Sequence, residues 1–357
     1  MTPIPPPAAF RDPPVWPELI HDEIELDELL TRPSPLLIQA IPSLSSPLVI
    51  LGAAGKMGPT LAVLAHRAAQ AAGHPLEIIA VSRFTDRAAR QWFEDRGVRT
   101  IPADLLDRSA VARLPDSTHV VYLVGRKFGT REDPSLCWAL NTLVPAHVAE
   151  RYPEARLVAL STGNVYPLLP VNANGATEDT PLTPLGEYAS AAIARERLFE
   201  YFSRIHGTRI ALIRLNYAVE LRYGVLVDIA RRIWAGEPVD LTNGWFNCLW
   251  QGDANERILR ALPLASSPAG AWNLTGPGKL EVRAVAQRLA ALLDRPARFV
   301  GQESETALLS NSARLDARLG AANTPVETML RWTAHWVGNG GRTLDKPTHF
   351  EVRDGGY

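Results

Sequence analysis

The chain has 357 residues, 46% of them hydrophobic, and a formal net charge of −1. This length allows one large domain or two coupled lobes, and the balanced charge argues against nucleic acid or an anionic membrane as partner. The histidines and cysteines show no metal-ligand spacing, so we expect no metal site. No apolar run is long enough to span a bilayer. The first ten residues lack the pattern of a secretory signal, so we expect a cytoplasmic location.

The predicted elements begin with an N-terminal extension over residues 1–47, which is Pro-rich and then predicts short helices over 22–30 and 34–41. From Leu48 onward, apolar strands alternate with amphipathic helices, a pattern that predicts a parallel sheet covered on both faces. The strands are expected at 48–51, 77–81, 119–124, 156–161 and 209–214, and the helices at 57–72, 86–96, 136–150, 187–206 and 225–235. We therefore predict an α/β domain with a doubly wound parallel sheet over 48–215.

After residue 215 the pattern becomes irregular, with helices expected near 253–262, 281–293 and 325–337. This part, 216–340, is interpreted as mainly a smaller C-terminal substrate lobe. Residues 341–357 form a polar, Gly-rich tail without periodicity. Both terminal segments are long enough to cover an active site, but the sequence does not assign them a role.

A glycine-rich turn follows the first strand. Gly52, Gly55 and Gly58 stand in a GxxGxxG spacing between the strand and the first long helix. Gly52 suits a tight turn, Gly55 lets a pyrophosphate approach the backbone, and Gly58 lets helix and strand pack closely. The N–H groups at the helix start, around Lys56 and Met57, would then face the anion. The turn therefore predicts a dinucleotide site, with an ordinary glycine-rich loop as the alternative.

The end of the second strand bears on the choice of cofactor. An acidic residue at this position holds the ribose hydroxyls of NAD, whereas here Ser82 is followed by Arg83. A hydroxyl and a guanidinium suit a 2′-phosphate, so we favour NADP(H) over NAD(H). The alternative is that Arg83 is a solvated loop residue.

Further landmarks then follow in chain order. Ala103-Asp104-Leu105 resembles an Asp-Leu pair that holds adenine, and Tyr122-Leu123-Val124-Gly125 resembles a strand end beside the cofactor phosphates and ribose. With the glycine turn, the chain from Leu48 to Trp336 resembles the extended short-chain dehydrogenases/reductases of the NAD(P)-dependent epimerase/dehydratase type. The resemblance implies a Rossmann-type fold, and it assigns Asp104, Leu105, Val124, Gly125 and Lys127 to the cofactor.

The same resemblance supplies the candidate catalytic residues. Residues 161–166, STGNVY, match the family's S-[ST]-x-x-V-Y run, which makes Thr162 catalytic, and Tyr188 resembles the tyrosine of YxxxK. Asn141 resembles the helix asparagine near the active site. In such sites a tyrosine exchanges a proton with a carbonyl or alcohol while hydride is transferred. To act as a base near neutrality, the tyrosine needs nearby positive charge that favours its deprotonated form, the tyrosinate. Tyr188 would also contact the cofactor.

The chain departs from the family where the lysine of YxxxK is expected, because Ala192 stands there. Three sources of positive charge are conceivable: the oxidised nicotinamide itself, Arg195 one turn further along and expected to be too distant, and Lys127. Lys127 matches a position where galactose epimerases carry a cofactor-contacting lysine, although it is more simply expected to hold cofactor phosphate. A catalytically inactive site that keeps the cofactor fold is the remaining alternative.

The substrate lobe departs as well. Phe246 replaces an arginine that holds the diphosphate in nucleotide-sugar epimerases, and buried diphosphate without bidentate cations is costly. Thr162, Asn164, Asn216 and Phe246 are the predicted substrate residues, although Phe246 and its neighbouring tryptophans also suit a core. Gly163-Asn164 replaces the Asp-Glu of sugar dehydratases, so loss of water is not expected.

The predicted function is an NADP(H)-dependent oxidoreductase or epimerase acting on a small hydroxylated carbonyl compound, like a sugar or sugar acid. The alternatives are a nucleotide-sugar epimerase with an unusual diphosphate grip and an inactive cofactor-binding protein. The resemblance also implies a homodimer built from the helices at 136–150 and 187–206.

Overall fold

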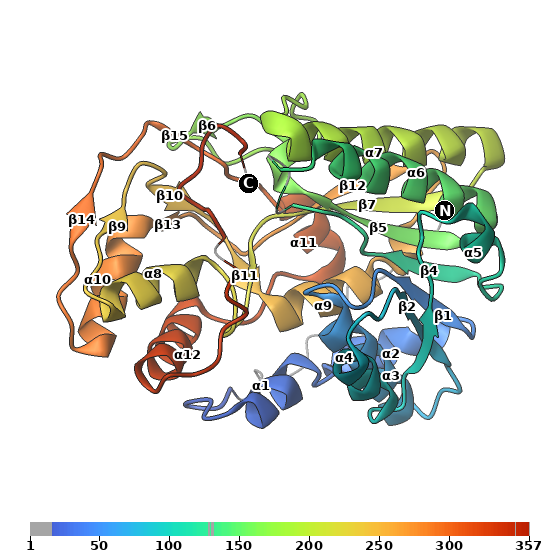
Figure 1. Ribbon diagram of the computed structural model, residues 1–357, viewed down its shortest axis with the longest axis horizontal. Helices are drawn as coiled ribbons and strands as arrows, with labels where there is room; N and C mark the ends of the chain where they lie inside the picture. Colours follow the sequence, from blue (N-terminus) through green and yellow to red (C-terminus); the bar gives the residue numbers. More distant parts are fainter. Residues whose placement is uncertain (1–15, 128, 130–131, 347, 357) are drawn as a thin grey trace.

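The centre of the molecule is a seven-stranded parallel sheet with the order β12-β7-β5-β4-β1-β2-β3 (Figure 1). A computed structural model describes residues 16–127, 129, 132–346 and 348–356. The strands of this sheet are β1 (Leu48–Leu51), β2 (Ile78–Ser82), β3 (Arg99–Pro102), β4 (His119–Tyr122), β5 (Arg156–Thr162), β7 (Arg209–Leu215) and β12 (Gly270–Leu274). The predicted doubly wound α/β fold is confirmed. The strand order reverses between β1 and β4, where such sheets form a ligand crevice at the carboxyl ends of their strands.

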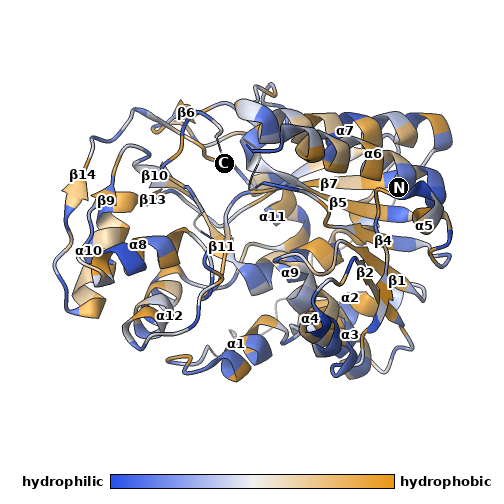
Figure 2. Cartoon of the chain, in the orientation of Figure 1, coloured by the Kyte–Doolittle hydropathy of each residue, from blue (hydrophilic) through white to orange (hydrophobic). Residues whose placement is uncertain are grey.

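Alternate residues of β1 show how the two faces are covered. Leu48 and Ile50 share a buried cluster with residues of α3 (Gly58–Ala71) and α9 (Gln251–Arg260), whereas Val49 and Leu51 share one with residues of α6 (Pro134–Arg151) and α7 (Gly186–His206). All four β1 side chains have 0% exposure, which explains the continuous apolar run. The strands of this sheet are coloured mainly as hydrophobic in Figure 2. Shorter helices, α4 (Arg87–Glu94), α5 (Arg108–Ala112) and α11 (Ala313–Leu319), complete these layers.

A smaller lobe is built on three helices that pack on one another: α8 (Val225–Trp234), α10 (Val282–Leu293) and α12 (Val326–Gly338). Two-residue strands pair around and beside them: β10 (Trp245–Phe246) with β13 (Leu280–Glu281), β9 (Val239–Asp240) with β14 (Phe299–Val300), β11 (Leu249–Trp250) with β8 (Ala218–Val219), and β6 (Leu169–Pro170) with β15 (Thr306–Ala307). The division at residue 215 is not sharp in space, because β12 joins the central sheet, α9 packs on α3, and α11 contacts β12.

The N-terminal extension contacts both parts of the molecule. It contains α1 (Glu23–Leu30), α2 (Pro35–Ala40) and a short 3-10 turn, η1 (Ile41–Ser43). Arg67 of α3 pairs with Glu28 at 2.7 Å, and the indole nitrogen of Trp332 in α12 donates to Pro17 O at 3.0 Å. The extension therefore joins the sheet domain to the smaller lobe. Within the described residues, none of the helices combines the length and the apolar character that crossing a membrane requires.

Candidate active site

The glycine turn after β1 has the geometry of an anion cradle. Gly52 adopts a φ of +78°, a conformation that residues other than glycine rarely adopt. A Cβ on Gly58 would lie 2.1 Å from Ala53 O, so only glycine lets the turn pack against the start of α3. Within the described part of the chain, the N–H groups of Lys56 and Met57 donate to no acceptor. Two unpaired donors at a helix start fit a phosphate group.

The side of this turn that faces the crevice leaves space around Gly55. A Cβ placed there would have only Gly52 O within 4 Å, at 3.3 Å. The carboxyl ends of β1, β2 and β4 lie side by side here, because Leu51 pairs with Val81 on one side and with Tyr122 on the other. The residues present therefore fit a dinucleotide pyrophosphate.

The predicted adenosine residues lie at the ends of β2 and β3. Ser82, the last residue of β2, accepts a hydrogen bond at its carbonyl from Ala103 N at 2.9 Å, which brings the two strand ends together. Arg83 is exposed and Ser82 is half-buried. The Asp104 carboxylate accepts from Leu106 N at 3.0 Å, and Leu105 is buried. The structure thus groups these predicted cofactor residues at one end of the crevice.

The predicted catalytic pair stands at the other end. Thr162 is the last residue of β5, and Tyr188 lies in the first turn of α7. The helix that carries Tyr188 packs on η2 (Gly163–Val165), the turn that follows Thr162. Thr162 Oγ1 lies 3.2 Å from Asn164 Oδ1 and accepts from Asn164 N at 3.2 Å. Tyr188 is half-buried.

The position of the missing lysine is closed by packing. Ala192 has 0% exposure and lies in a small buried cluster with Val165, Tyr166 and Ala176. A charged side chain at residue 192 would have to enter this apolar cluster, where an unpaired charge is costly. Any positive charge near Tyr188 must therefore come from another position.

Arg195 reaches the predicted cofactor segment, which the sequence analysis did not expect. Its Nη1 donates to Val124 O at 2.9 Å and to Asn141 Oδ1 at 3.0 Å, and the residue is buried. Asn141 also donates through Nδ2 to Cys137 O at 2.8 Å. The side chain of Asn141 is thus engaged between α6 and α7. Its Oδ1 accepts from Arg195, which in turn contacts the backbone of Val124, next to Gly125.

Two lysines turn inward near this end of the crevice. Lys56 Nζ donates to Ala218 O at 2.6 Å and lies 4.1 Å from the centre of the Tyr223 ring. Burial lowers the pKa of Lys56 to about 7, and burial likewise lowers the pKa of Lys127 to about 8. Burial raises the pKa of Tyr223, and the nearby Asp228 carboxylate raises it further. Lys56 therefore lies against the ring of Tyr223.

The predicted substrate residues of the smaller lobe are buried. Asn216 follows β7 and donates through Nδ2 to Asn247 Oδ1 at 2.6 Å, and its own Oδ1 would lie 3.1 Å from a Cβ on Gly163. It thus lies beside the turn that carries Asn164. Phe246 has 1% exposure and belongs to the apolar core of the smaller lobe with Trp250. Its burial fits a core aromatic.

A buried ion pair supports the strand that ends at Thr162. Arg214 of β7 and Glu196 of α7 pair at 2.7 Å, with side-chain exposures of 5% and 0%. Glu196 also accepts from Ser161 Oγ at 2.5 Å, and Arg214 donates to the Tyr166 hydroxyl at 2.8 Å. The network fixes the end of β5 to α7 and β7, and with it the position of Thr162 relative to Tyr188.

The chain after α12 returns across the crevice. Thr348 donates through its backbone N–H to the Asp228 carboxylate at 2.8 Å and accepts at its carbonyl from Lys127 Nζ at 3.1 Å. Phe350 is buried, and its carbonyl accepts from Asn243 Nδ2 at 2.7 Å. The tail therefore contacts a predicted cofactor residue as well as the smaller lobe.

The end of the tail lies against the start of α7, two residues before Tyr188. A Cβ on Gly186 would lie 2.4 Å from Gly355 O, and one on Gly355 would lie 2.0 Å from Leu185 O. The space left between the tail and Asn164 is narrow, because the centre of a water molecule can move within only ≈ 20 Å³ there. Figure 1 shows this red segment ending between the smaller lobe and the start of α7. The tail's lack of periodicity gave no signal for this path.

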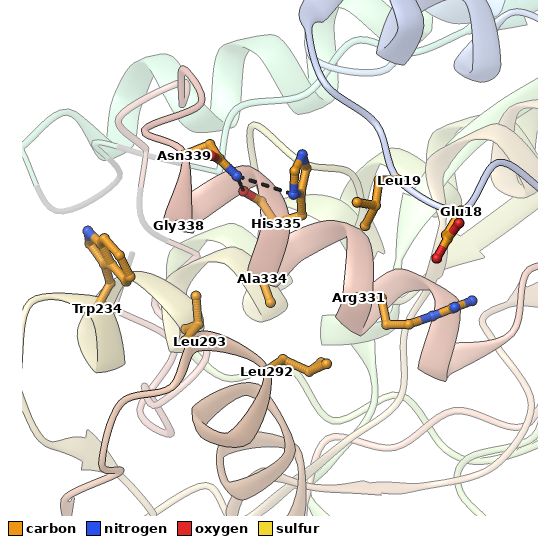
Figure 3. Close-up of a pocket in the computed structure, with 10 residues that line it drawn as sticks. All are labelled: Glu18, Leu19, Trp234, Leu292, Leu293, Arg331, Ala334, His335, Gly338 and Asn339. Atoms are coloured by element: carbon orange, nitrogen blue, oxygen red, sulfur yellow. Dashed lines mark hydrogen bonds between the residues drawn. The ribbon is translucent and has the colours of Figure 1, made fainter.

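A separate pocket of ≈ 360 Å³ opens on the smaller lobe between α8, α10, α12 and the N-terminal extension. Figure 3 shows Trp234, Leu293 and His335 around it, with Asn339 hydrogen-bonded to His335. It contains none of the predicted site residues. Among the described residues, no group of three or more His, Cys, Asp or Glu side chains is arranged to hold a metal ion.

The fold and the glycine turn together define a dinucleotide-binding protein of the Rossmann class. A family model makes the assignment more precise. Residues 48–242, more than half of the chain, match the NAD dependent epimerase/dehydratase family, and the chain therefore belongs to that family. It is therefore of the extended short-chain dehydrogenase/reductase type, as the sequence analysis predicted. No curated protein sequence matches the chain.

Solved structures similar to this one include three enzymes from bacteria. The UDP-glucose 4-epimerase of Thermus thermophilus, in complex with NAD, has a TM-score of 0.66 and 22% identity over 82% of this chain and 99% of its own. A UDP-glucuronic acid 4-epimerase variant from Bacillus cereus, with NAD and a fluorinated UDP-sugar, has a TM-score of 0.69 and 15% identity over 82% and 98%. A dTDP-glucose 4,6-dehydratase from Bacillus anthracis, with NAD, has a TM-score of 0.68 and 16% identity over 82% and 96%. These likenesses support the fold.

Proposed function

We propose that the protein is an NADP(H)-dependent oxidoreductase or epimerase that acts on a hydroxylated carbonyl compound like a sugar or sugar acid. The observation that carries the proposal is the position of Thr162 and Tyr188 at the same carboxyl edge of the sheet as the open glycine turn. Bound NADP⁺ would supply the hydride acceptor. The N–H groups of Lys56 and Met57 would hold its pyrophosphate, and Ser82 and Arg83 its 2′-phosphate.

In the proposed reaction the Thr162 and Tyr188 hydroxyls hold the oxygen of one substrate alcohol. Tyr188 accepts the hydroxyl proton as the carbon loses hydride to bound NADP⁺, which leaves a carbonyl. In an epimerase the hydride would return to the opposite face of the carbonyl carbon, while Tyr188 gives the proton back to the oxygen. Tyr188 needs nearby positive charge to act as a base near neutrality. Lys56, Lys127 and Arg195 are the proposed sources besides the cofactor, because Ala192 leaves the family position without charge.

Nucleotide-linked sugars are the second candidate substrate class. The similar structures named above are of enzymes whose names specify UDP-linked or dTDP-linked sugars, which favours this class. Against it, buried Phe246 offers no charge for a diphosphate. Tight binding of UDP would support the second class, and its absence would favour an unactivated substrate.

The proposed assembly is a homodimer formed by α6 and α7. Trp138 and Leu143 of α6 and Tyr201 and Ile205 of α7 are large apolar side chains with exposures of 38%, 51%, 50% and 51%. A face formed by two adjacent helices with such residues is typical of an interface. Sedimentation of the native protein and of Leu143→Glu tests it: the variant should shift toward monomer.

The function is tested by incubating the protein with NADP(H) or NAD(H) and a panel of free sugars, sugar acids, polyols and UDP-sugars. Nicotinamide absorbance reports net redox turnover, and product stereochemistry reports epimerisation. Activity on an unactivated compound would support the proposal. Activity confined to UDP-sugars would favour the second class, and cofactor binding without any reaction would favour an inactive cofactor-binding protein.

A further inference from the structure

The tail over the crevice, residues 348–356, is called here the C-terminal strap. It lines and narrows the space beside Asn164, to which the strap contributes Val352, Arg353 and Gly355. A substrate that occupies this space meets the inner side of the strap. The side chains that the strap presents to this space become part of the substrate site.

Arg353 is one of these side chains. It lines the space together with Asn164, Tyr217 and Asn243. Neutral oxygens fix its guanidinium: Nη1 donates to Asn243 Oδ1 at 3.2 Å and to Thr306 O at 2.6 Å, and Nη2 donates to Thr306 Oγ1 at 2.6 Å. Nε–H and one Nη2–H are left without a protein acceptor within the described part of the chain.

Within the described chain, Arg353 has no carboxylate partner. Among the described residues, no carboxylate oxygen lies within the 4.0 Å of an ion pair from its guanidinium. Burial without a nearby anion lowers the pKa of Arg353. A partly buried charge held only by neutral groups gains free energy when an anion binds, especially through two parallel N–H donors. The contrast is Arg342, an exposed arginine of the same tail, which pairs with Glu23 at 2.6 Å.

We propose that Arg353 binds the oxyanion of an acidic substrate, a carboxylate or a phosphate, in the space that Asn164 and Leu185 also line. The inference rests on the proposed function, since it concerns the substrate of the same site, and it narrows that substrate to an acidic sugar or similar compound. Arg353 acts as a specificity residue: it selects the ligand and does not take part in the proton transfer.

The test uses the full-length protein loaded with NADP⁺ and measures binding by calorimetry, so that it does not depend on turnover. Matched series of neutral hexoses, hexuronic acids and hexose 1-phosphates are titrated into the native protein, Arg353→Gln and Arg342→Gln. One acidic series should bind roughly 10- to 100-fold more tightly than its neutral counterparts. Arg353→Gln should remove this preference, whereas Arg342→Gln should keep it. The series that responds distinguishes carboxylate from phosphate.

Equal binding of acidic and neutral sugars to the native protein would overturn the inference, and this outcome requires no variant to fold. An unchanged preference in a folded Arg353→Gln protein would overturn it as well. Arg353→Lys, which retains the charge without the planar fork, should keep a weakened preference. Hydride transfer to a neutral sugar without anion preference would refute only the role of Arg353. Anion preference without hydride transfer would refute only the proposed function.

Discussion

Substitution of Gly55 by alanine separates the cofactor role of the glycine turn from its role in folding. The added methyl group meets only Gly52 O within 4 Å, at 3.3 Å, and Gly55 has no positive φ. The free energy of unfolding should therefore change by less than about 1 kcal/mol. The methyl group would stand where the pyrophosphate approaches the N–H groups of Lys56 and Met57. Loss of one charge-assisted hydrogen bond costs about 1.5–3 kcal/mol, so cofactor affinity should fall roughly 10- to 150-fold.

The assay is equilibrium titration of NADP(H) followed by nicotinamide fluorescence, together with thermal unfolding of the same samples. Gly338→Ala at the end of α12 is the matched control, because its added methyl group would meet Leu293 Cδ2 at an ordinary 3.6 Å. It should leave cofactor affinity unchanged. If Gly55→Ala bound the cofactor as tightly as the native protein, the pyrophosphate would not lie at this turn.

Four further predictions concern single side chains. The pKa of Lys56 is about 7 in the folded protein against 10.5 for an ordinary lysine. Between these pH values the unfolded chain binds more protons than the folded protein does. The free energy of unfolding of the cofactor-free protein should therefore rise with pH in this range. A bound pyrophosphate favours the charged lysine, so calorimetry in buffers of different ionisation enthalpy should detect proton uptake on NADP⁺ binding near pH 8, and Lys56→Met should remove it. Arg83→Gln should weaken NADP(H) roughly 5- to 30-fold and leave NAD(H) unchanged in parallel titrations, because only the 2′-phosphate needs the guanidinium; equal losses would refute NADP(H) selection. Glu196→Gln should lower the free energy of unfolding by about 3–5 kcal/mol in urea titrations, because it leaves Arg214 buried without its anion, and a loss below about 1 kcal/mol would contradict that reasoning. Ala192→Lys should lower the melting temperature without raising activity, and a gain in turnover would show that residue 192 faces the cofactor.

The fold follows closely from sequence pattern where strands are fully buried. The run Leu48–Leu51 is apolar at every position because both faces are covered, and its bounds were predicted correctly. β3 was missed because it is an edge strand with exposed Arg99 and Pro102 at its ends, and β12 because Gly270–Leu274 lies far along the chain in a lobe expected to be separate. Local pattern carries no information about such a return to the sheet.

The candidate site was predictable where it depends on local motifs. The glycine turn and Thr162 stand in short runs at strand ends, and Tyr188 was predicted from its resemblance to the tyrosine of YxxxK. The contact of Arg195 with Val124 was not expected, because helical spacing from Tyr188 gives the face of the helix but not the reach of a long side chain. Arg353 could not be found at all, since it reaches the site through a tail without regular structure.

The most direct test of the account is a single-turnover measurement of hydride transfer. The native protein and Tyr188→Phe, each loaded with NADP⁺, are mixed with the sugar or sugar acid that binds best, and the appearance of reduced nicotinamide is followed by absorbance. The account predicts reduction in the native protein and a rate roughly 10²- to 10⁴-fold lower in Tyr188→Phe at unchanged cofactor affinity. Equal rates in the two proteins, or tight cofactor binding with no reduction by any compound of the panel, would contradict it.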